Sequence, residues 1–196
     1  MTNEELREAL LAAPKNGYTK LSCEQREEMN AYCKRYSAFM DACKTEREAA
    51  AWTVEVAEKN GFKPLVPGME LKPGDKVYKN NRNKNILLAV IGSASLNEGV
   101  NICAAHTDSP RMDLKPNPLY EDSEIAYFKT HYYGGIKKYQ WPTVPLAIHG
   151  VVCRKDGTSV TVTIGEEDTD PVLVVSDLLI HLSGDQMKKT LAEGIA

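Results

Sequence analysis

Hydrophobic residues recur at helical spacing through the first third of the chain. One short pattern covers residues 4–11, and Pro14 is expected to end it. A longer pattern begins at Ser22, where Gln25 three positions later predicts a capping box, a reciprocal pair of side-chain to backbone hydrogen bonds. The apolar residues of this second helix recur at steps of three and four and define one face: Met29, Tyr32, Cys33, Tyr36, Phe39 and Met40.

A second capping box and a change of pattern follow. Thr45 and Glu48 predict the start of a helix over residues 46–59, which Asn60 and Gly61 are expected to end. Short apolar runs bounded by Gly, Asn or Ser then predict strands, of which the last two are expected to be buried: residues 77–79, 86–92 and 100–105. Helices followed by buried strands predict an α/β fold in which at least one face of a sheet is covered.

The second half of the chain has a different pattern and predicts a separate, β-rich domain. Prolines interrupt it, and its apolar runs are expected to form strands over residues 144–154, 159–165 and 172–175. Asp156 and Gly157 predict the hairpin turn between the first two of these strands. We therefore expect two domains, residues 1–115 and 116–196. Helical spacing over 178–182 and 187–191 stops abruptly, so we expect the chain to be part of a longer protein.

Composition and charge narrow the class of protein. Of the 196 residues, 42% are hydrophobic and 26% charged, which is too apolar for a disordered chain. The longest apolar run, residues 86–91, is far shorter than the ~18–20 residues of a membrane span, and we expect no secretory signal. A net charge of -3 with scattered basic residues argues against nucleic-acid binding. The five cysteines lack close pairs, so we expect reduced thiols and a cytoplasmic protein.

The residues with the clearest chemistry follow the strand expected at 100–105. His106 and Asp108 are two positions apart, so in extended backbone their side chains point to the same side. The imidazole there can offer one ring nitrogen to a metal ion, while a carboxylate bonded to the other nitrogen fixes the tautomer. The end of a buried parallel strand is also where α/β proteins place ligands. Taken alone, so short a pattern is more often a hydrogen-bonded pair at a strand end, and both interpretations stay open.

The other reactive side chains have more ordinary roles available to them. His131 lies in a Tyr- and Gly-rich stretch that either faces a substrate or packs between domains. His149 alternates with apolar residues on an expected strand, which indicates a structural histidine. Cys103 is either the nucleophile of a cysteine hydrolase, whose alkylation would abolish activity, or a small buried hydrophobic residue.

A longer set of motifs carries a family resemblance. His106-Thr-Asp-Ser-Pro is followed by Lys115-Pro-Asn-Pro-Leu-Tyr, and then by Lys-Thr-His-Tyr-Tyr-Gly-Gly-Ile-Lys-Lys-Tyr-Gln-Trp over residues 129–141. In this order the motifs resemble the M18 family of metalloaminopeptidases, in particular the bacterial relatives of aspartyl aminopeptidase. The resemblance extends over about residues 30–196.

This resemblance implies a fold, an activity and site residues. It implies two metal ions, usually zinc but with cobalt or manganese as alternatives, on an α/β catalytic domain that begins within residues 1–115. An inserted dimerisation domain would begin within residues 116–196, and the dimers would build a dodecamer. Such enzymes remove single residues from the amino end of peptides. His106 matches a zinc ligand, and the expected catalytic residues are Asp108, which orients that histidine, and His181, which reaches a neighbouring subunit and helps to stabilise the transition state.

The remaining ligands that the resemblance implies have no counterpart in this chain. They would be further Asp, Glu and His residues downstream, including a Glu-Glu pair. Glu166 and Glu167 form the only Glu-Glu pair in the second half, and their place in a turn without a neighbouring strand-end histidine predicts a solvated turn. We therefore expect an incomplete amino-terminal part of a zinc aminopeptidase that is inactive alone. The alternative is a non-catalytic binding or assembly module on the same scaffold.

Overall fold

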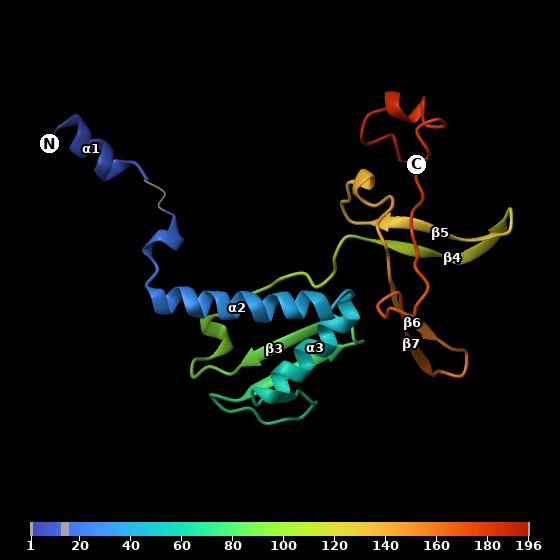
Figure 1. Ribbon diagram of the computed structural model, residues 1–196. Coiled ribbons are helices and arrows are strands. Elements are labelled where there is room, and N and C mark those ends of the chain that lie inside the picture. The colour runs from blue at the N-terminus through green and yellow to red at the C-terminus, as the bar shows by residue number, and fades with distance from the viewer. Residues whose placement is uncertain (1, 13–15, 196) are drawn as a thin grey trace. The chain divides into compact units, whose positions relative to one another are not determined.

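The computed structural model describes residues 2–12 and 16–195, and the chain divides after Ala42 into two compact units. The expected helix end at Pro14 lies outside the described residues. The first unit is helical and consists of α1 (Asn3–Leu10), the short 3₁₀ helix η1 (Gly17–Lys20) and α2 (Cys23–Ala42) (Figure 1). No helix in the described part of the chain has the length and hydropathy that a membrane span requires.

The long helix α2 follows its sequence closely. In the expected capping box, the Gln25 N–H donates to Ser22 Oγ at 3.2 Å and the Ser22 N–H donates to Gln25 Oε1 at 3.0 Å. The rings of Tyr32, Tyr36 and Phe39 stack in a row along the helix, with centroid separations of 6.5 and 6.1 Å. These apolar residues therefore share one side of the helix, as predicted, but none of the described residues of α2 is buried.

The second unit begins with a helix whose ends were both predicted. In α3 (Glu46–Lys59), the Glu48 N–H donates to Thr45 Oγ1 at 3.3 Å, and the Thr45 N–H donates to Glu48 Oε2 at 2.8 Å. Gly61 follows with φ at +82°, a left-handed conformation that glycine adopts without steric cost and that ends the helix.

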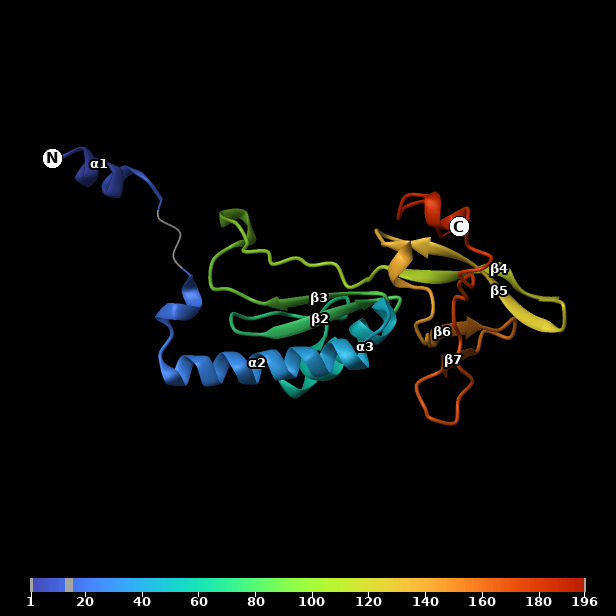
Figure 2. The same cartoon turned by 45° about the horizontal axis from the view of Figure 1, so that its top comes forward.

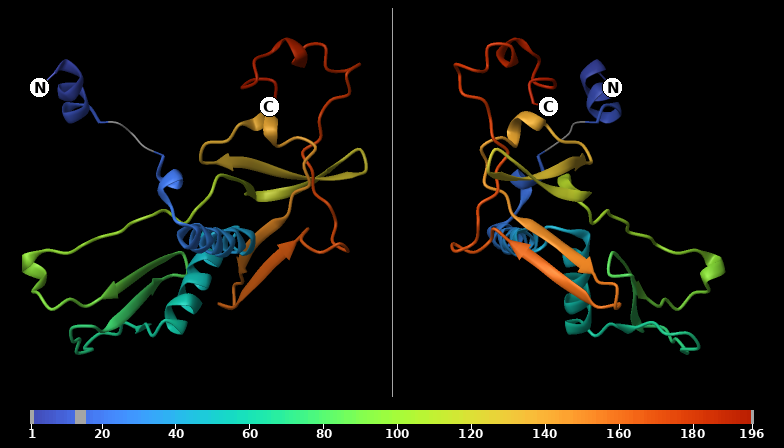
Figure 3. Two further views of the ribbon diagram at one scale, coloured as in Figure 1. Left: turned by 60° about the vertical axis from the view of Figure 1, so that its left-hand side comes forward. Right: turned by 90° about the vertical axis from the view of Figure 1, so that its right-hand side faces the viewer.

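This helix covers a small mixed sheet. The strands are β1 (Lys63–Pro64), β2 (Lys76–Asn81) and β3 (Asn85–Val90), in the order β1-β2-β3. β1 runs parallel to β2, and β2 pairs antiparallel with β3. α3 packs on β2 and β3 (Figure 3), and the buried apolar residues of the described chain lie in these elements: Ala49, Ala50, Ala57, Val77 and Tyr78. One face of the sheet is thus covered, which confirms the α/β prediction, although β3 itself is largely exposed.

Two hairpins follow the sheet (Figure 2). The first, β4 (Arg111–Asp122) and β5 (Ile125–Tyr133), was not predicted, because the prolines in this region were expected to interrupt regular structure. The strand accommodates Pro116 and Pro118 in a bulge, since its register shifts between Leu114 and Leu119. Proline lacks an N–H, so it is tolerated where the pairing lapses.

The second hairpin confirms its sequence signals. β6 (Ile148–Cys153) pairs antiparallel with β7 (Ser159–Ile164), within the two apolar runs expected there. At the predicted turn, Gly157 has φ at +85° and the Thr158 N–H donates to Asp156 Oδ1 at 2.9 Å.

The strand expected over residues 100–105 is absent. Val100 and Ile102 are exposed, and none of the described residues pairs with this segment. An apolar run becomes a strand only when a neighbour satisfies its backbone groups, and residues 2–12 and 16–195 provide no such neighbour. Cys103 is exposed, so the alternative that made it a small buried residue is wrong.

The end of the chain also differs from expectation. The run at 172–175 forms only isolated bridges, from Leu173 to Leu146 and from Val175 to Pro142. The helical segments expected at 178–182 and 187–191 are replaced by turns and the short 3₁₀ helix η4 (Gln186–Lys188). Segments this short are marginal as isolated α-helices, and their apolar side chains are exposed rather than packed.

The expected domain boundary after residue 115 falls inside β4.

Candidate metal centre

His106 lies in the extended segment that leads from the 3₁₀ helix η2 (Leu96–Glu98) into β4. Its Nδ1 is 3.1 Å from Asp108 Oδ1 and 2.8 Å from the Asp108 carbonyl oxygen. Both of these atoms are acceptors, so Nδ1 carries the proton and donates. This arrangement leaves the Nε2 lone pair for a ligand, and the side chain is 82% exposed. The structure thus brings together the two residues singled out from the sequence and presents the imidazole to solvent.

Asp108 is itself held from the other side. The Tyr133 hydroxyl, at the end of β5, donates to Asp108 Oδ2 at 2.6 Å. This hydrogen bond, more than any other contact, holds the pKa of Asp108 below its usual range, and it raises the pKa of the Tyr133 hydroxyl. The carboxylate therefore stays ionised, which is the state that can accept from both the phenol and the imidazole. Tyr133 is 25 positions from Asp108, so no local spacing in the sequence indicates this contact.

The described residues fit one ligand position of a zinc centre rather than a whole centre. His106 offers a neutral imidazole nitrogen whose partner nitrogen is bonded to a carboxylate, which is the arrangement usual for zinc-binding histidines. A catalytic zinc ion takes at least three protein ligands. Within residues 2–12 and 16–195, no group of three or more His, Cys, Asp or Glu side chains is close enough to hold a metal ion.

His181 lies away from this pair. It occupies an exposed turn within residues 180–182, where the Leu182 N–H donates to the Leu179 carbonyl at 2.8 Å. No contact in the described part of the chain joins it to His106 or Asp108. The three expected site residues are therefore one contacting pair and one separate histidine.

His149 forms a charged cluster with Glu48 and Glu166 that the sequence pattern did not indicate. Its Nδ1 lies 2.7 Å from Glu48 Oε1, and its Nε2 lies 2.7 Å from Glu166 Oε1. Burial alone lowers the pKa of His149, but the two carboxylates outweigh it and raise that pKa above its usual value. Burial likewise raises the pKa of Glu48, and its hydrogen bonds with His149 and Thr45 bring it below its usual range. Glu166 is exposed, as predicted for a solvated turn, but the prediction that it has no histidine neighbour is wrong, because strand pairing carries His149 to it.

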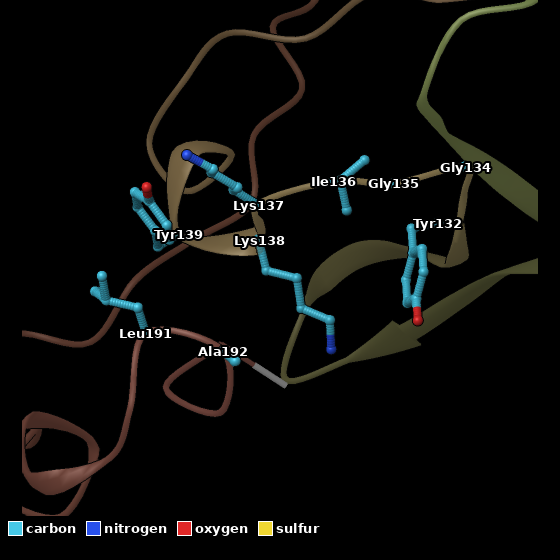
Figure 4. Close-up of a pocket in the computed structure, with 9 residues that line it drawn as sticks. All are labelled: Tyr132, Gly134, Gly135, Ile136, Lys137, Lys138, Tyr139, Leu191 and Ala192. Carbon is cyan, nitrogen blue, oxygen red and sulfur yellow. The ribbon is translucent and has the colours of Figure 1, made fainter.

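A pocket of about 510 Å³ is lined by the Tyr- and Gly-rich stretch, together with Leu191 and Ala192 (Figure 4). Gly134 has φ at +73°, and a side chain there would lie 3.5 Å from Pro110. Glycine adopts this left-handed conformation without steric cost, and the 3.5 Å distance is an ordinary van der Waals contact. The Lys137 and Lys138 ammonium groups point away from each other in Figure 4, so they do not converge on one anion.

Comparison with known proteins agrees with the M18 resemblance of the sequence motifs. The family model described as aminopeptidase I zinc metalloprotease (M18) matches residues 39–194. The chain is 50% identical over 190 residues to a probable M18 family aminopeptidase 1 of Clostridium acetobutylicum, covering 95% of this chain and 41% of that relative. It is 44% identical over 164 residues to the Thermotoga maritima protein of the same description, covering 84% of this chain and 36% of that relative.

Solved structures show the same relation. The crystal structure of an M18 family aminopeptidase from Thermotoga maritima matches with a TM-score of 0.83 at 41% identity, covering 95% of this chain and 40% of that structure. The crystal structure of aminopeptidase I from Clostridium acetobutylicum matches with a TM-score of 0.81 at 48% identity. The match covers 95% of this chain and 42% of that structure. The chain thus spans about 40% of the length of these relatives.

Proposed function

Because the chain belongs to the M18 family of zinc metalloproteases, as its motifs predicted, we propose that the intact gene product is an aminopeptidase. It would remove single residues from the amino end of peptides, and this chain would contribute part of its site. The observation that carries the proposal is the exposed His106 imidazole, bonded through Nδ1 to Asp108, in a chain that the family model matches over residues 39–194.

His106 would hold one metal ion through Nε2, while Asp108 keeps the proton on Nδ1 and fixes the plane of the ring. When bound, zinc supplies Lewis-acid polarisation of the peptide carbonyl and of water. The proposal includes the two zinc ions per subunit that the family resemblance implies, with cobalt or manganese as alternatives. His106 would supply one ligand position, and the other ligands would come from outside the described residues.

The wider organisation also belongs to this proposal. Residues 1–115 would form the amino-terminal part of the catalytic domain, and residues 116–196 would begin an inserted dimerisation domain. Dimers would build a dodecamer, and His181 would act at the site of a neighbouring subunit. Its place in an exposed turn is consistent with a contact made outside its own chain. The five free cysteines support a reducing compartment such as the cytoplasm.

A second candidate is a non-catalytic binding or assembly module on the same scaffold. It is favoured by the single ligand position that the described residues provide. A cysteine hydrolase centred on the exposed Cys103 is the third. The three differ in their response to chemical treatment. A chelator stops a zinc aminopeptidase, alkylation stops a cysteine hydrolase, and a binding module has no activity to lose.

The decisive experiment measures metal content and aminopeptidase activity of the intact gene product, with and without chelator. His106→Ala is expected to lose one metal ion and nearly all activity, because it removes a ligand outright. The matched control is His131→Ala, since His131 is exposed and the one hydrogen bond of its side chain among the described residues is with the neighbouring Tyr132 carbonyl at 3.2 Å. Unchanged zinc content in His106→Ala, or activity that survives the chelator, would refute the proposal.

A further inference from the structure

The Tyr133 hydroxyl ends a short chain of hydrogen bonds that leads to the proposed metal ligand. It donates to Asp108 Oδ2 at 2.6 Å, and Asp108 Oδ1 accepts from His106 Nδ1 at 3.1 Å. Each carboxylate oxygen therefore has a different partner, and the plane of the carboxylate is defined from two directions. Charge-assisted O–H to carboxylate bonds of this length are among the stronger hydrogen bonds in proteins.

Asp108 needs such support because its own backbone provides little. The segment over 99–110 pairs with no strand in the described part of the chain, and the Asp108 side chain is 35% exposed. A carboxylate with one partner on a segment of this kind can rotate about its side-chain bonds. Fixing it with a second partner lowers the entropy that must be lost when the imidazole is oriented.

Tyr133, by contrast, is anchored in regular structure. It pairs with Arg111 across the β4–β5 ladder, and the Arg111 guanidinium lies 4.2 Å from the centre of its ring. Arg111 is itself fixed, because its Nε donates to Asp113 Oδ1 at 2.8 Å. The next residue, Gly134, lies against Pro110, so the end of β5 is close to the segment that carries Asp108. The hairpin therefore supplies the rigidity that the segment over 99–110 lacks.

We infer that Tyr133 is a positioning residue for metal binding, which acts through Asp108 to hold the His106 imidazole with Nε2 directed outward. This inference rests on the proposed function and adds to it a residue that lies outside the metal's own ligands. The β4–β5 hairpin, which was not predicted because of its prolines, would thus hold the site residues in place.

The test uses the intact gene product and the variant Tyr133→Phe, which removes one oxygen atom and keeps the ring on Arg111. Zinc affinity, measured by competition with a chelating dye, is expected to fall about tenfold, the lower end of the range for losing an outer partner of a metal-binding histidine. Nitrogen NMR of the zinc-free protein is expected to show a larger fraction of His106 with its proton on Nε2. The matched control is Tyr132→Phe, whose neighbouring, exposed hydroxyl makes no hydrogen bond among the described residues.

A double-mutant cycle separates positioning from a general structural effect. Alanine at position 108 cannot accept the hydroxyl, so Tyr133→Phe is expected to change zinc affinity little in an Asp108→Ala background. A full tenfold loss in that background would overturn the inference, as would wild-type affinity in Tyr133→Phe while Asp108→Ala is impaired. Zinc binding that is absent from the wild-type protein would instead refute the proposed function. If Tyr133→Phe unfolds while Tyr132→Phe does not, the hydroxyl is structural and the inference is also wrong.

Discussion

Replacing His149 with phenylalanine tests the charged cluster that joins α3 to the second hairpin. A planar aromatic ring is kept, although phenyl is larger than imidazole, and both 2.7 Å contacts, to Glu48 and Glu166, are lost. The exposed fractions of the three side chains are 12%, 28% and 43% for His149, Glu48 and Glu166. The Glu48 contact is the more sheltered of the two and is expected to carry most of the effect.

The magnitude follows from this burial. Removing one partner of a sheltered, charged hydrogen bond costs about 1–3 kcal/mol. Glu48 keeps its hydrogen bonds with Thr45, so the carboxylate is not orphaned and the lower half of that range applies. The Glu166 contact is largely solvated and adds well under 1 kcal/mol. We expect His149→Phe to lower the free energy of unfolding by about 1–2 kcal/mol near pH 6.

The effect should depend on pH in a defined direction. The folded-state pKa of His149 lies above its usual value of about 6.5, so its contribution is complete below that pH and is lost as pH rises through the folded-state pKa. The folded-state pKa of Glu48 lies below its usual value of about 4.3, so its contribution is present above that pH and is lost as pH falls through the folded-state pKa. The difference in free energy of unfolding between wild type and variant should therefore be greatest between about pH 5 and 6.5. It should become smaller at alkaline pH.

Urea unfolding of the intact gene product from pH 5 to 9 provides the measurement. His131→Phe is the matched control, because the His131 side chain is exposed and bonds, among the described residues, only to a neighbouring carbonyl. Its effect is expected to stay within ~0.5 kcal/mol. If the two variants gave the same free energy of unfolding across this range, the cluster would contribute nothing and the reasoning would be wrong. A destabilisation that did not vary with pH would instead assign the effect to packing.

Three further predictions concern the site and the backbone. Asp108→Asn should leave the fold intact, judged by circular dichroism, but weaken zinc affinity about 10- to 100-fold in a competition assay, because the ring loses its ionised acceptor. His181→Ala should lower turnover while metal content stays full, and unchanged turnover would exclude its role at a neighbouring subunit's site. Gly165→Ala should lower the free energy of unfolding by more than Gly157→Ala. Both have positive φ, at +99° and +85°, but only at Gly165 would the new methyl group approach Ala147, at 3.0 Å from its Cα atom. Equal losses would contradict the contact argument.

Local signals in the sequence determined the helices and one hairpin. The two capping boxes pair residues three positions apart, and Asp156-Gly157 forms its turn within a few residues. The contact of His106 with Asp108 is of the same kind, since only one residue separates them. Interactions over such short separations depend on the local backbone, which residue type and spacing largely fix.

Only the tertiary structure decided which distant residues meet. His149 and Glu48 are 101 positions apart, and Tyr133 reaches Asp108 over 25 positions, so no periodicity or motif encodes either contact. The apolar run at 100–105 likewise shows that local sequence does not determine long-range pairing. Its composition favours a strand, yet a strand requires a partner for its backbone groups, and the folded chain provides none among the described residues. The sequence determined which segments can form helices and turns, whereas the path of the chain decided which side chains share a site.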